Sequence, residues 1–130
     1  MRITVARTNG SSGLISVRYY TYNGSATSGS DYTGVTLGTL SFGSGETSKT
    51  ISIPLNNDNN VELDEDFFLV LTNATGGARI YSAGNPTGNP ATNSLTARAV
   101  IIDNDLASGK ANFASATFVA IEGSGGAQIS

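Results

Sequence analysis

The stretch "DFFLVLT" (Asp66–Thr72) is apolar on both of its alternating faces, which is typical of a β-strand at the centre of a sheet. It directly follows "NNDNNVELDE" (Asn56–Glu65), which is rich in carboxylates and asparagines. Between Asp58 and Asp66 the chain places five of its ten acidic residues. Like charges this close repel one another, so something in the fold should compensate for them.

On either side of this strand, apolar and polar residues alternate with a period of two, as they do in half-buried strands. Turn signals such as Asn9-Gly10 and Asn23-Gly24 separate the alternating segments. Strands are expected at residues 2–8, 14–21, 35–42, 49–55, 66–72, 95–102 and, late in the chain, 116–121. This spacing predicts an all-β fold, an immunoglobulin-like antiparallel β-sandwich of about seven strands.

Composition excludes several classes of function. The chain has 130 residues, a net charge of −3 and no cysteine or histidine. The negative charge argues against a nucleic-acid partner, and the missing residue types remove disulfides and the usual zinc ligands. No apolar run approaches the roughly 20 residues of a membrane-spanning helix, and no signal-peptide pattern is visible in the sequence.

The acidic residues are distributed unevenly among the predicted connections. Because consecutive strands of an antiparallel sandwich run in opposite directions, alternate connections lie at the same end. Three such connections carry Asp31, Asp58, Glu62, Asp64, Glu65, Asp103 and Asp105, and Glu122 joins them if the late strand precedes the first. The opposite end carries only Glu46.

Converging carboxylates on flexible loops are the ligands that Ca²⁺ prefers, since it takes six to eight oxygens. Asn57, Asn59, Asn60 and Asn104 are available to complete such a shell. The alternative is that these acids only form turns and remain solvated. Asp64 and Asp66 are expected to be solvated neighbours of the ligands rather than ligands.

Paired carboxylates also occur in glycosidases, but the chain has no Trp to form a sugar platform, so no enzyme is expected. Tyr19, Tyr20 and Tyr22 leave a sugar-binding module open, although alternating tyrosines usually pack across strands.

Four segments resemble the Calx-β domain, the module of sodium/calcium exchangers and of many large bacterial and animal surface proteins. They are "TYNGSATSGSDY" (21–32), "GTLSFGSGETSKTISIPL" (38–55), "NDNNVELDEDFFLVL" (57–71) and "ARAVIIDND" (97–105). The resemblance implies a two-sheet sandwich and, matched by position, calcium ligands at Asp31, Asp58, Glu62, Glu65, Asp103 and Asp105, with Glu122 as the early Glu of the family. Asn57, Asn59 and Asn104 stand where strong binders carry Asp, which implies fewer ions or weaker binding.

The resemblance also implies a domain arrangement. Residues 1–105 match a sandwich without its first strand, residues 106–112 look like a linker, and residues 113–130 look like the first strand of a following repeat. This order suggests a piece of a tandem array. The late strand would then complete its own sandwich or exchange with a second copy, giving a strand-exchanged homodimer.

The function expected from the sequence is that of a calcium-binding structural or adhesive module in a repetitive extracellular or cell-surface protein, of bacterial origin. Its partners would be calcium ions and neighbouring repeats. The alternative is a structural or adhesive β-sandwich that works without calcium.

Overall fold

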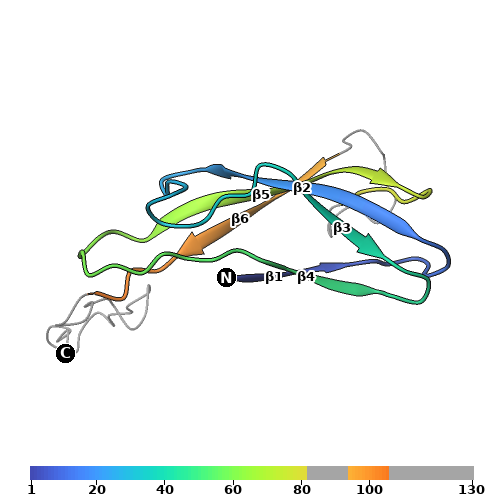
Figure 1. Cartoon of the computed structure of the whole chain (residues 1–130), viewed down its shortest axis with the longest axis horizontal. Helices are drawn as coiled ribbons and strands as arrows, with labels where there is room; N and C mark the ends of the chain where they lie inside the picture. Colours follow the sequence, from blue (N-terminus) through green and yellow to red (C-terminus); the bar gives the residue numbers. More distant parts are fainter. Residues whose placement is uncertain (82–93, 106–130) are drawn as a thin grey trace, which may run out of the picture.

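The computed structural model describes residues 1–81 and 94–105, which form two sheets of antiparallel strands facing each other (Figure 1). The strands are β1 (Arg2–Ala6), β2 (Ile15–Asn23), β3 (Gly38–Phe42), β4 (Ser48–Ser52), β5 (Glu65–Thr75) and β6 (Ser94–Ile101). The described residues include no helix that is long and apolar enough to cross a membrane. The predicted all-β antiparallel sandwich is confirmed.

The larger sheet has the order β3-β2-β5-β6, so β5 lies between two partners. Phe67 and Leu69 face the core and are buried, while Val70 on the opposite face is also buried. Burial on both faces explains why "DFFLVLT" carries apolar residues on both faces, and it confirms the prediction of a central strand.

The smaller sheet pairs β1 with β4, with Ile3 opposite Ile51. Strand β4 ends at Ser52, earlier than the predicted 49–55, although Ile53 still exchanges backbone hydrogen bonds with Met1. Leu55 makes only an isolated bridge to Tyr32. Conversely, β5 continues to Thr75, beyond the predicted end of that strand.

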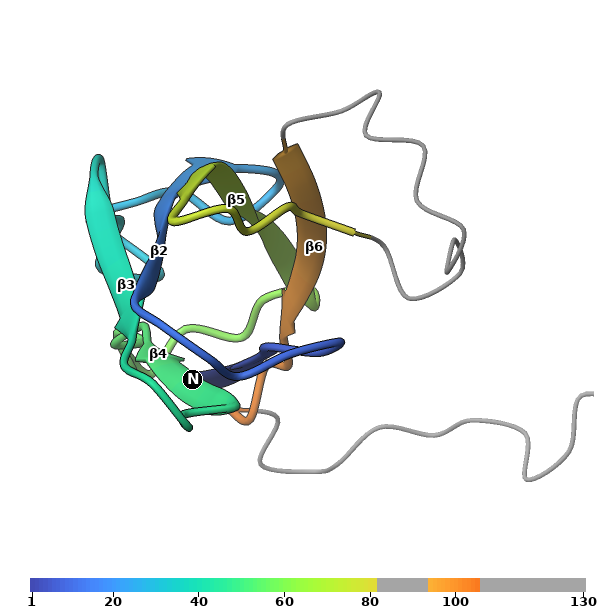
Figure 2. The ribbon, with the colours of Figure 1, turned by 90° about the vertical axis from the view of Figure 1, so that its right-hand side faces the viewer.

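Viewed along its long axis, the sandwich is a ring of strands in which β6 and β1 face each other across one side (Figure 2). The core cluster packs Ile51, Ile53, Phe67 and Leu69 between the sheets. The predicted linker 106–112 and late strand 116–121 lie outside the described residues.

Candidate metal site

Asp31 lies in the β2–β3 loop, where it is followed by a residue that anchors the loop in the core. Tyr32 is fully buried; its ring stacks on Phe67 with centroids 4.2 Å apart, and its hydroxyl donates to Asn23 Oδ1 at 2.8 Å. Asp31 Oδ2 accepts the backbone N–H of Thr27 at 2.6 Å. The loop therefore has a buried anchor directly beside a half-exposed carboxylate.

Asn56 holds this loop from the other side, a role that no sequence pattern indicates. Its side-chain amide donates to the carbonyls of Gly29 and Ser30, each at 3.0 Å. Its backbone N–H donates to the carbonyl of Asp31, also at 3.0 Å. Asn56 thus fixes the Asp31 loop against the segment that follows β4.

Glu65 reaches the same end because of the strand alternation in β5. As the first residue of β5, it shares the inward face with Phe67 and Leu69. Asp66 points to the opposite, outward face. The alternation therefore places the Glu65 side chain at the end of the core and the Asp66 side chain on the outer face of the sheet.

The end of β6 supplies two more carboxylates, since Asp103 and Asp105 continue the inward alternation of Ile101. Asp103 Oδ1 accepts the N–H of Asp105 at 3.2 Å. Asp103 Oδ2 is buried and has no hydrogen-bond partner in the part of the chain that the structure describes. A buried carboxylate oxygen without a donor is costly, so this atom suits a site that binds a cation.

The loop between β4 and β5 contributes Asp58 and Glu62, both exposed. Asp58 accepts both the backbone N–H and the side-chain amide of Asn60, at 2.8 and 3.1 Å. This loop closes the end of the sandwich between Asp31 and the exit of β6.

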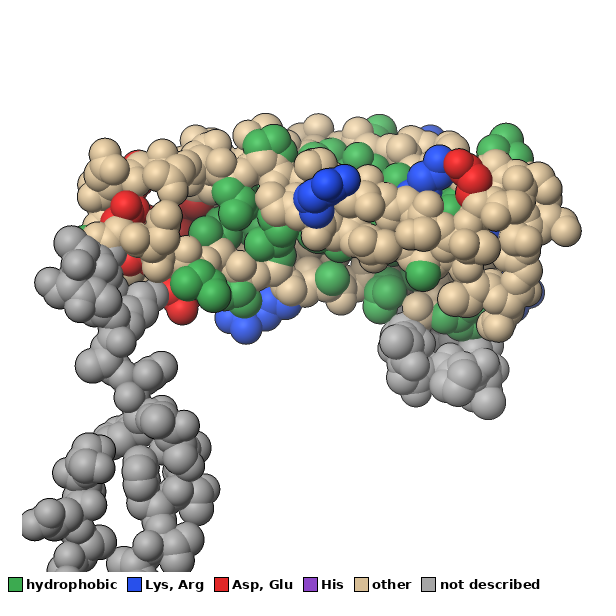
Figure 3. Space-filling view, turned by 90° about the horizontal axis from the view of Figure 1, so that it is seen from below, with side chains coloured by type: hydrophobic (Ala, Val, Ile, Leu, Met, Phe, Trp, Pro, Cys, Tyr) green, Lys and Arg blue, Asp and Glu red, His purple; other side chains and the backbone are tan. Residues whose placement is uncertain are grey.

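These segments enclose one hollow of about 290 Å³, here called the acidic pocket. Within it, one carboxylate oxygen from each of Asp31, Glu62 and Glu65 lies within 4.8 Å of the other two. No Lys or Arg appears among the described residues that line it. Most acidic side chains visible in Figure 3 gather at this end of the molecule. The six predicted acids in the pocket are Asp31, Asp58, Glu62, Glu65, Asp103 and Asp105.

The electrostatics of the pocket follow from this crowding. Partial removal from water raises the pKa of Glu62, and the negative charges of Asp58, Asp31, Asp103 and Asp105 raise it further. The pKa of Glu65 is raised in the same way, first by partial desolvation and then by the charges of Asp31 and Glu62. Both carboxylates are thus held where their ionised form is disfavoured unless a positive charge joins them.

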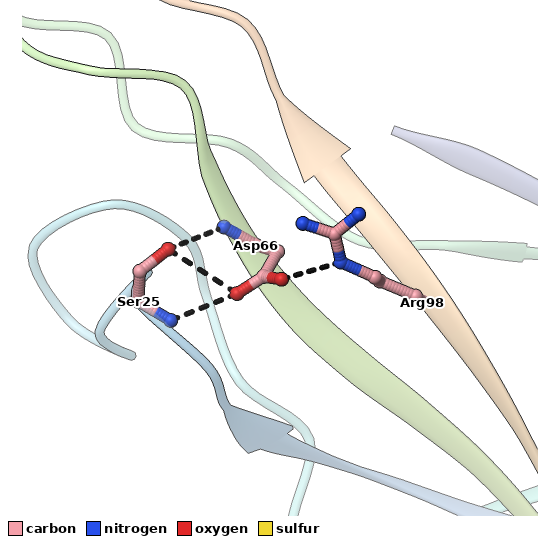
Figure 4. A network of polar contacts seen from close by, with 3 residues as sticks. All are labelled: Ser25, Asp66 and Arg98. Carbon is pink, nitrogen blue, oxygen red and sulfur yellow. Dashed lines mark hydrogen bonds and ion pairs between the residues drawn. The ribbon is translucent and has the colours of Figure 1, made fainter.

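Asp66 is not a solvated neighbour, and that prediction is wrong. Its carboxylate accepts the backbone N–H and hydroxyl of Ser25 at 2.9 and 3.2 Å, and pairs with Arg98 at 2.5 Å (Figure 4). The Ser25 N–H and the Arg98 guanidinium lower the pKa of Asp66. Asp66 therefore ties the β2–β3 loop to β5 and β6 instead of serving the pocket.

Asp64 is exposed, as expected for a solvated residue, but it also accepts the N–H of Asp103 at 3.2 Å. Of the predicted asparagines, Asn57 and Asn104 line the pocket, whereas Asn59 and Asn60 are not among its lining residues. Glu122 lies outside the described residues. The donor set is thus all oxygen, which suits a hard divalent cation such as Ca²⁺.

Comparisons with known proteins agree with this architecture. The model of the Calx-beta domain family matches residues 1–105. The apo form of the Calx CBD1 domain is similar, with 28% identity and a TM-score of 0.67, over 81% of this chain and 82% of that chain. The calcium-binding domain CBD12 of CALX1.1 is similar at 28% identity and a TM-score of 0.67, over 81% of this chain and 39% of that chain.

CBD12 from CALX1.2 is similar at 28% identity and a TM-score of 0.68, over 81% of this chain and 38% of that chain. The chain therefore spans about two fifths of each CBD12 structure. The match to the family model covers both sheets and every segment of the acidic pocket. It confirms the resemblance found in the sequence: the chain belongs to the Calx-beta domain family.

Proposed function

We propose that this chain is a calcium-binding, non-catalytic module whose acidic pocket holds the ion. The observation that carries the proposal is the meeting of three carboxylates, Asp31 from the β2–β3 loop and Glu62 and Glu65 from the stretch that leads into β5, within 4.8 Å of one another. The buried Oδ2 of Asp103, which has no hydrogen-bond partner within residues 1–81 and 94–105, supports it, because a cation would satisfy that atom. The similar structures point in the same direction, since one of them is the calcium-binding domain CBD12 of CALX1.1.

The role of the ion would be to neutralise the pocket and join its loops. Asp31, Glu62 and Glu65 would hold the ion, and Asp103 and Asp105 would add charge from the exit of β6. Without the ion, mutual repulsion loosens the β2–β3 loop, the loop before β5 and the end of β6. An ion that binds only the folded form at 100 times its Kd adds about 2.7 kcal/mol to the free energy of unfolding.

Calorimetric titration with CaCl₂ tests the proposal directly, with MgCl₂ as a second ion. The chain should bind Ca²⁺, and Glu62→Gln should weaken the binding at least about tenfold, as the loss of even an outer metal-site contact does. Glu46→Gln is the matched control, because Glu46 lies at the opposite end and pairs with Lys49 at 2.7 Å. Equal affinity in Glu62→Gln and the unchanged chain would contradict the assignment of the pocket.

The second candidate is a structural or adhesive sandwich that works without calcium. Tyr22 is 44% exposed on the outward face of β2 and stacks on Phe68 with ring centroids 4.8 Å apart, which gives an aromatic surface for a sugar or protein. Thermal melts with CaCl₂ and with EDTA separate the two candidates. An unchanged melting temperature at millimolar calcium would favour the calcium-independent one.

The wider setting that we propose is a repetitive extracellular or cell-surface protein, bacterial in origin, in which such modules follow one another as spacers or adhesive units. In support, the similar CBD12 structures are more than twice as long as the part this chain covers. Asp103 and Asp105 stand immediately before the chain continues beyond β6, so calcium there would also restrain the angle to the next module.

A further inference from the structure

The chain contains two Asn-Gly pairs, Asn9-Gly10 and Asn23-Gly24, and both pairs are exposed. At such a pair the backbone nitrogen of the glycine can attack the side-chain amide of the asparagine, because glycine has no side chain to hinder the approach. The attack requires a backbone nitrogen and a side-chain amide that are both free to move. Since exposure does not distinguish the two pairs, their hydrogen bonds decide which of them can react.

Asn23-Gly24 is held by hydrogen bonds on both of its reacting groups. Asn23 Oδ1 accepts the backbone N–H of Ser28 at 2.9 Å and the hydroxyl of Tyr32 at 2.8 Å. The N–H of Gly24 donates to the carbonyl oxygen of Asp66 at 3.2 Å. Asn23 is also the last residue of β2 and is paired with β5. A reaction here would have to break these bonds and turn the peptide group out of the ladder.

Asn9-Gly10 lies in the loop between β1 and β2 and lacks these restraints. The backbones of Arg7 and Ser11 are each hydrogen-bonded to the turn between β3 and β4, at 2.8 and 2.7 Å. Between these two anchors, neither the Asn9 side chain nor the Gly10 N–H makes a hydrogen bond within residues 1–81 and 94–105. Asn9 has a φ of 59°, in the left-handed region, so it lies at a bend and not in a ladder. The tip of this loop can therefore rotate its peptide groups at little cost.

We propose that Asn9 is a site of spontaneous deamidation in the folded protein, whereas the fold protects Asn23. The backbone nitrogen of Gly10 loses its proton and forms a bond to Cγ of Asn9. The bond from Cγ to Nδ2 breaks, so ammonia leaves and a succinimide ring remains. Water then opens the ring at one of its two carbonyls, which gives either an aspartate or an isoaspartate. The reaction consumes only water and releases only ammonia.

The modification changes the charge at the end of the sandwich that lies opposite the acidic pocket. Either product adds one negative charge to a chain whose net charge is −3. The new carboxylate would lie close in sequence to Arg7, whose guanidinium donates to the carbonyls of Ser12 and Gly13 at 2.5 and 2.9 Å. An acid near this cation is favourable, so the loop should tolerate the product.

The protection of Asn23 matters more for the fold. An isoaspartate there would lengthen the backbone between β2 and the loop that carries Asp31. It would also disturb the hydrogen bond that Tyr32 donates to Asn23 Oδ1. The structure thus leaves the reactive pair at a loop tip and holds the pair beside the buried anchor of the acidic pocket.

Peptide mapping of the full chain tests the proposal, because trypsin separates the two pairs. Cleavage after arginine and lysine releases residues 8–18 and 19–49, each of which contains a single asparagine. The folded chain is incubated in a mildly alkaline buffer, and mass spectrometry follows the conversion of amide to carboxylate in each peptide. Asn9 should convert at least about tenfold faster than Asn23, since several hydrogen bonds hold the latter. In guanidinium chloride, which unfolds the chain, the two rates should become similar.

Asn9→Gln is the control variant, because its longer side chain would have to close a larger and less favourable ring. Its peptide 8–18 should keep its mass, while Asn23 should convert at the same rate as in the unchanged chain.

Two results would overturn the proposal. Equal rates at Asn9 and Asn23 in the folded chain, or no conversion at either, would show that the hydrogen bonds described above do not select the site. A difference that persists in guanidinium chloride would trace it to the neighbouring residues in the sequence and not to the fold.

Discussion

Glu65 and Asp66 are adjacent in the chain but belong to opposite faces of β5 and to different interactions. Glu65 faces the acidic pocket, with one oxygen within 4.8 Å of oxygens of Asp31 and Glu62. Asp66 faces outward and accepts hydrogen bonds from Ser25 and Arg98. Successive side chains of a strand point to opposite faces. Glu65 is therefore a candidate ligand for an ion, whereas the adjacent Asp66 has a structural role.

Substituting these two neighbours should separate calcium affinity from stability. Glu65→Gln should weaken calcium binding at least about tenfold without lowering the melting temperature in EDTA, because it removes a repelled charge. Asp66→Asn should lower the melting temperature by several degrees with or without calcium, because it weakens the pairing with Ser25 and Arg98. Calorimetry and melts on both variants check this. If Asp66→Asn weakened calcium binding and Glu65→Gln lowered the melting temperature in EDTA, the assignment of Glu65 to the acidic pocket would be contradicted.

The stability of the calcium-free protein should depend on pH in a defined direction. Folding raises the pKa of Glu62 and Glu65, so the folded state binds their protons more tightly than the unfolded state does. The free energy of unfolding then falls as pH rises through these raised values. Asp66, whose pKa is lowered, acts in the opposite sense, and its contribution is lost only at lower pH, as pH falls through its native pKa.

Melts in a metal-free buffer between about pH 4.5 and pH 7.5 should therefore show a lower melting temperature toward neutral pH. With saturating calcium the trend should reverse, because the ligands must lose their protons to bind. The double variant Glu62→Gln/Glu65→Gln should flatten the metal-free slope. A slope that persists in this variant would trace the effect to other groups.

The sequence predicted the acidic end but not every role within it. In an antiparallel sandwich, every second connection between strands lies at the same end. Counting the connections was therefore enough to predict that Asp31, Glu65 and Asp103 meet at one end. The role of Asp66 depends on Arg98, which is brought beside it by the register of β5 with β6, and on Ser25 in an irregular loop. Neither the register nor the loop conformation is encoded in local periodicity, so Asp66 was misassigned. The anchoring by Asn56 was missed for the same reason.

Tyr32 should control the stability of the end that carries the pocket. Tyr32→Ala removes a fully buried ring that stacks on Phe67 and should cost about 3–5 kcal/mol. Tyr32→Phe keeps the ring and should cost only about 1 kcal/mol, since Asn23 Oδ1 still accepts the N–H of Ser28. Denaturant unfolding of both variants measures the difference, and equal costs would show that the ring stack contributes little.

A side chain at Gly24 should be costly, because the backbone just after β2 passes close to Asp66. A Cβ at this position would lie 2.2 Å from Asp66 Oδ1 and 2.6 Å from the carbonyl oxygen of Asp66. Gly24→Ala should therefore destabilise the fold by about 1–3 kcal/mol. Gly43→Ala is the matched control, as its nearest neighbour would be Glu46 Oε2 at 3.4 Å. Denaturant midpoints that fall equally in both variants would contradict this explanation.

The Tyr32–Phe67 stack has a consequence for how such a module can evolve. Asp31 precedes one stacked ring, and Glu65 lies two residues before the other, so a single core contact sets the positions of two carboxylates. Glu62, in contrast, is carried by an exposed loop. Selection can therefore change the length and charge of that loop, and with them the response to ions, while the inherited framework of the domain stays intact.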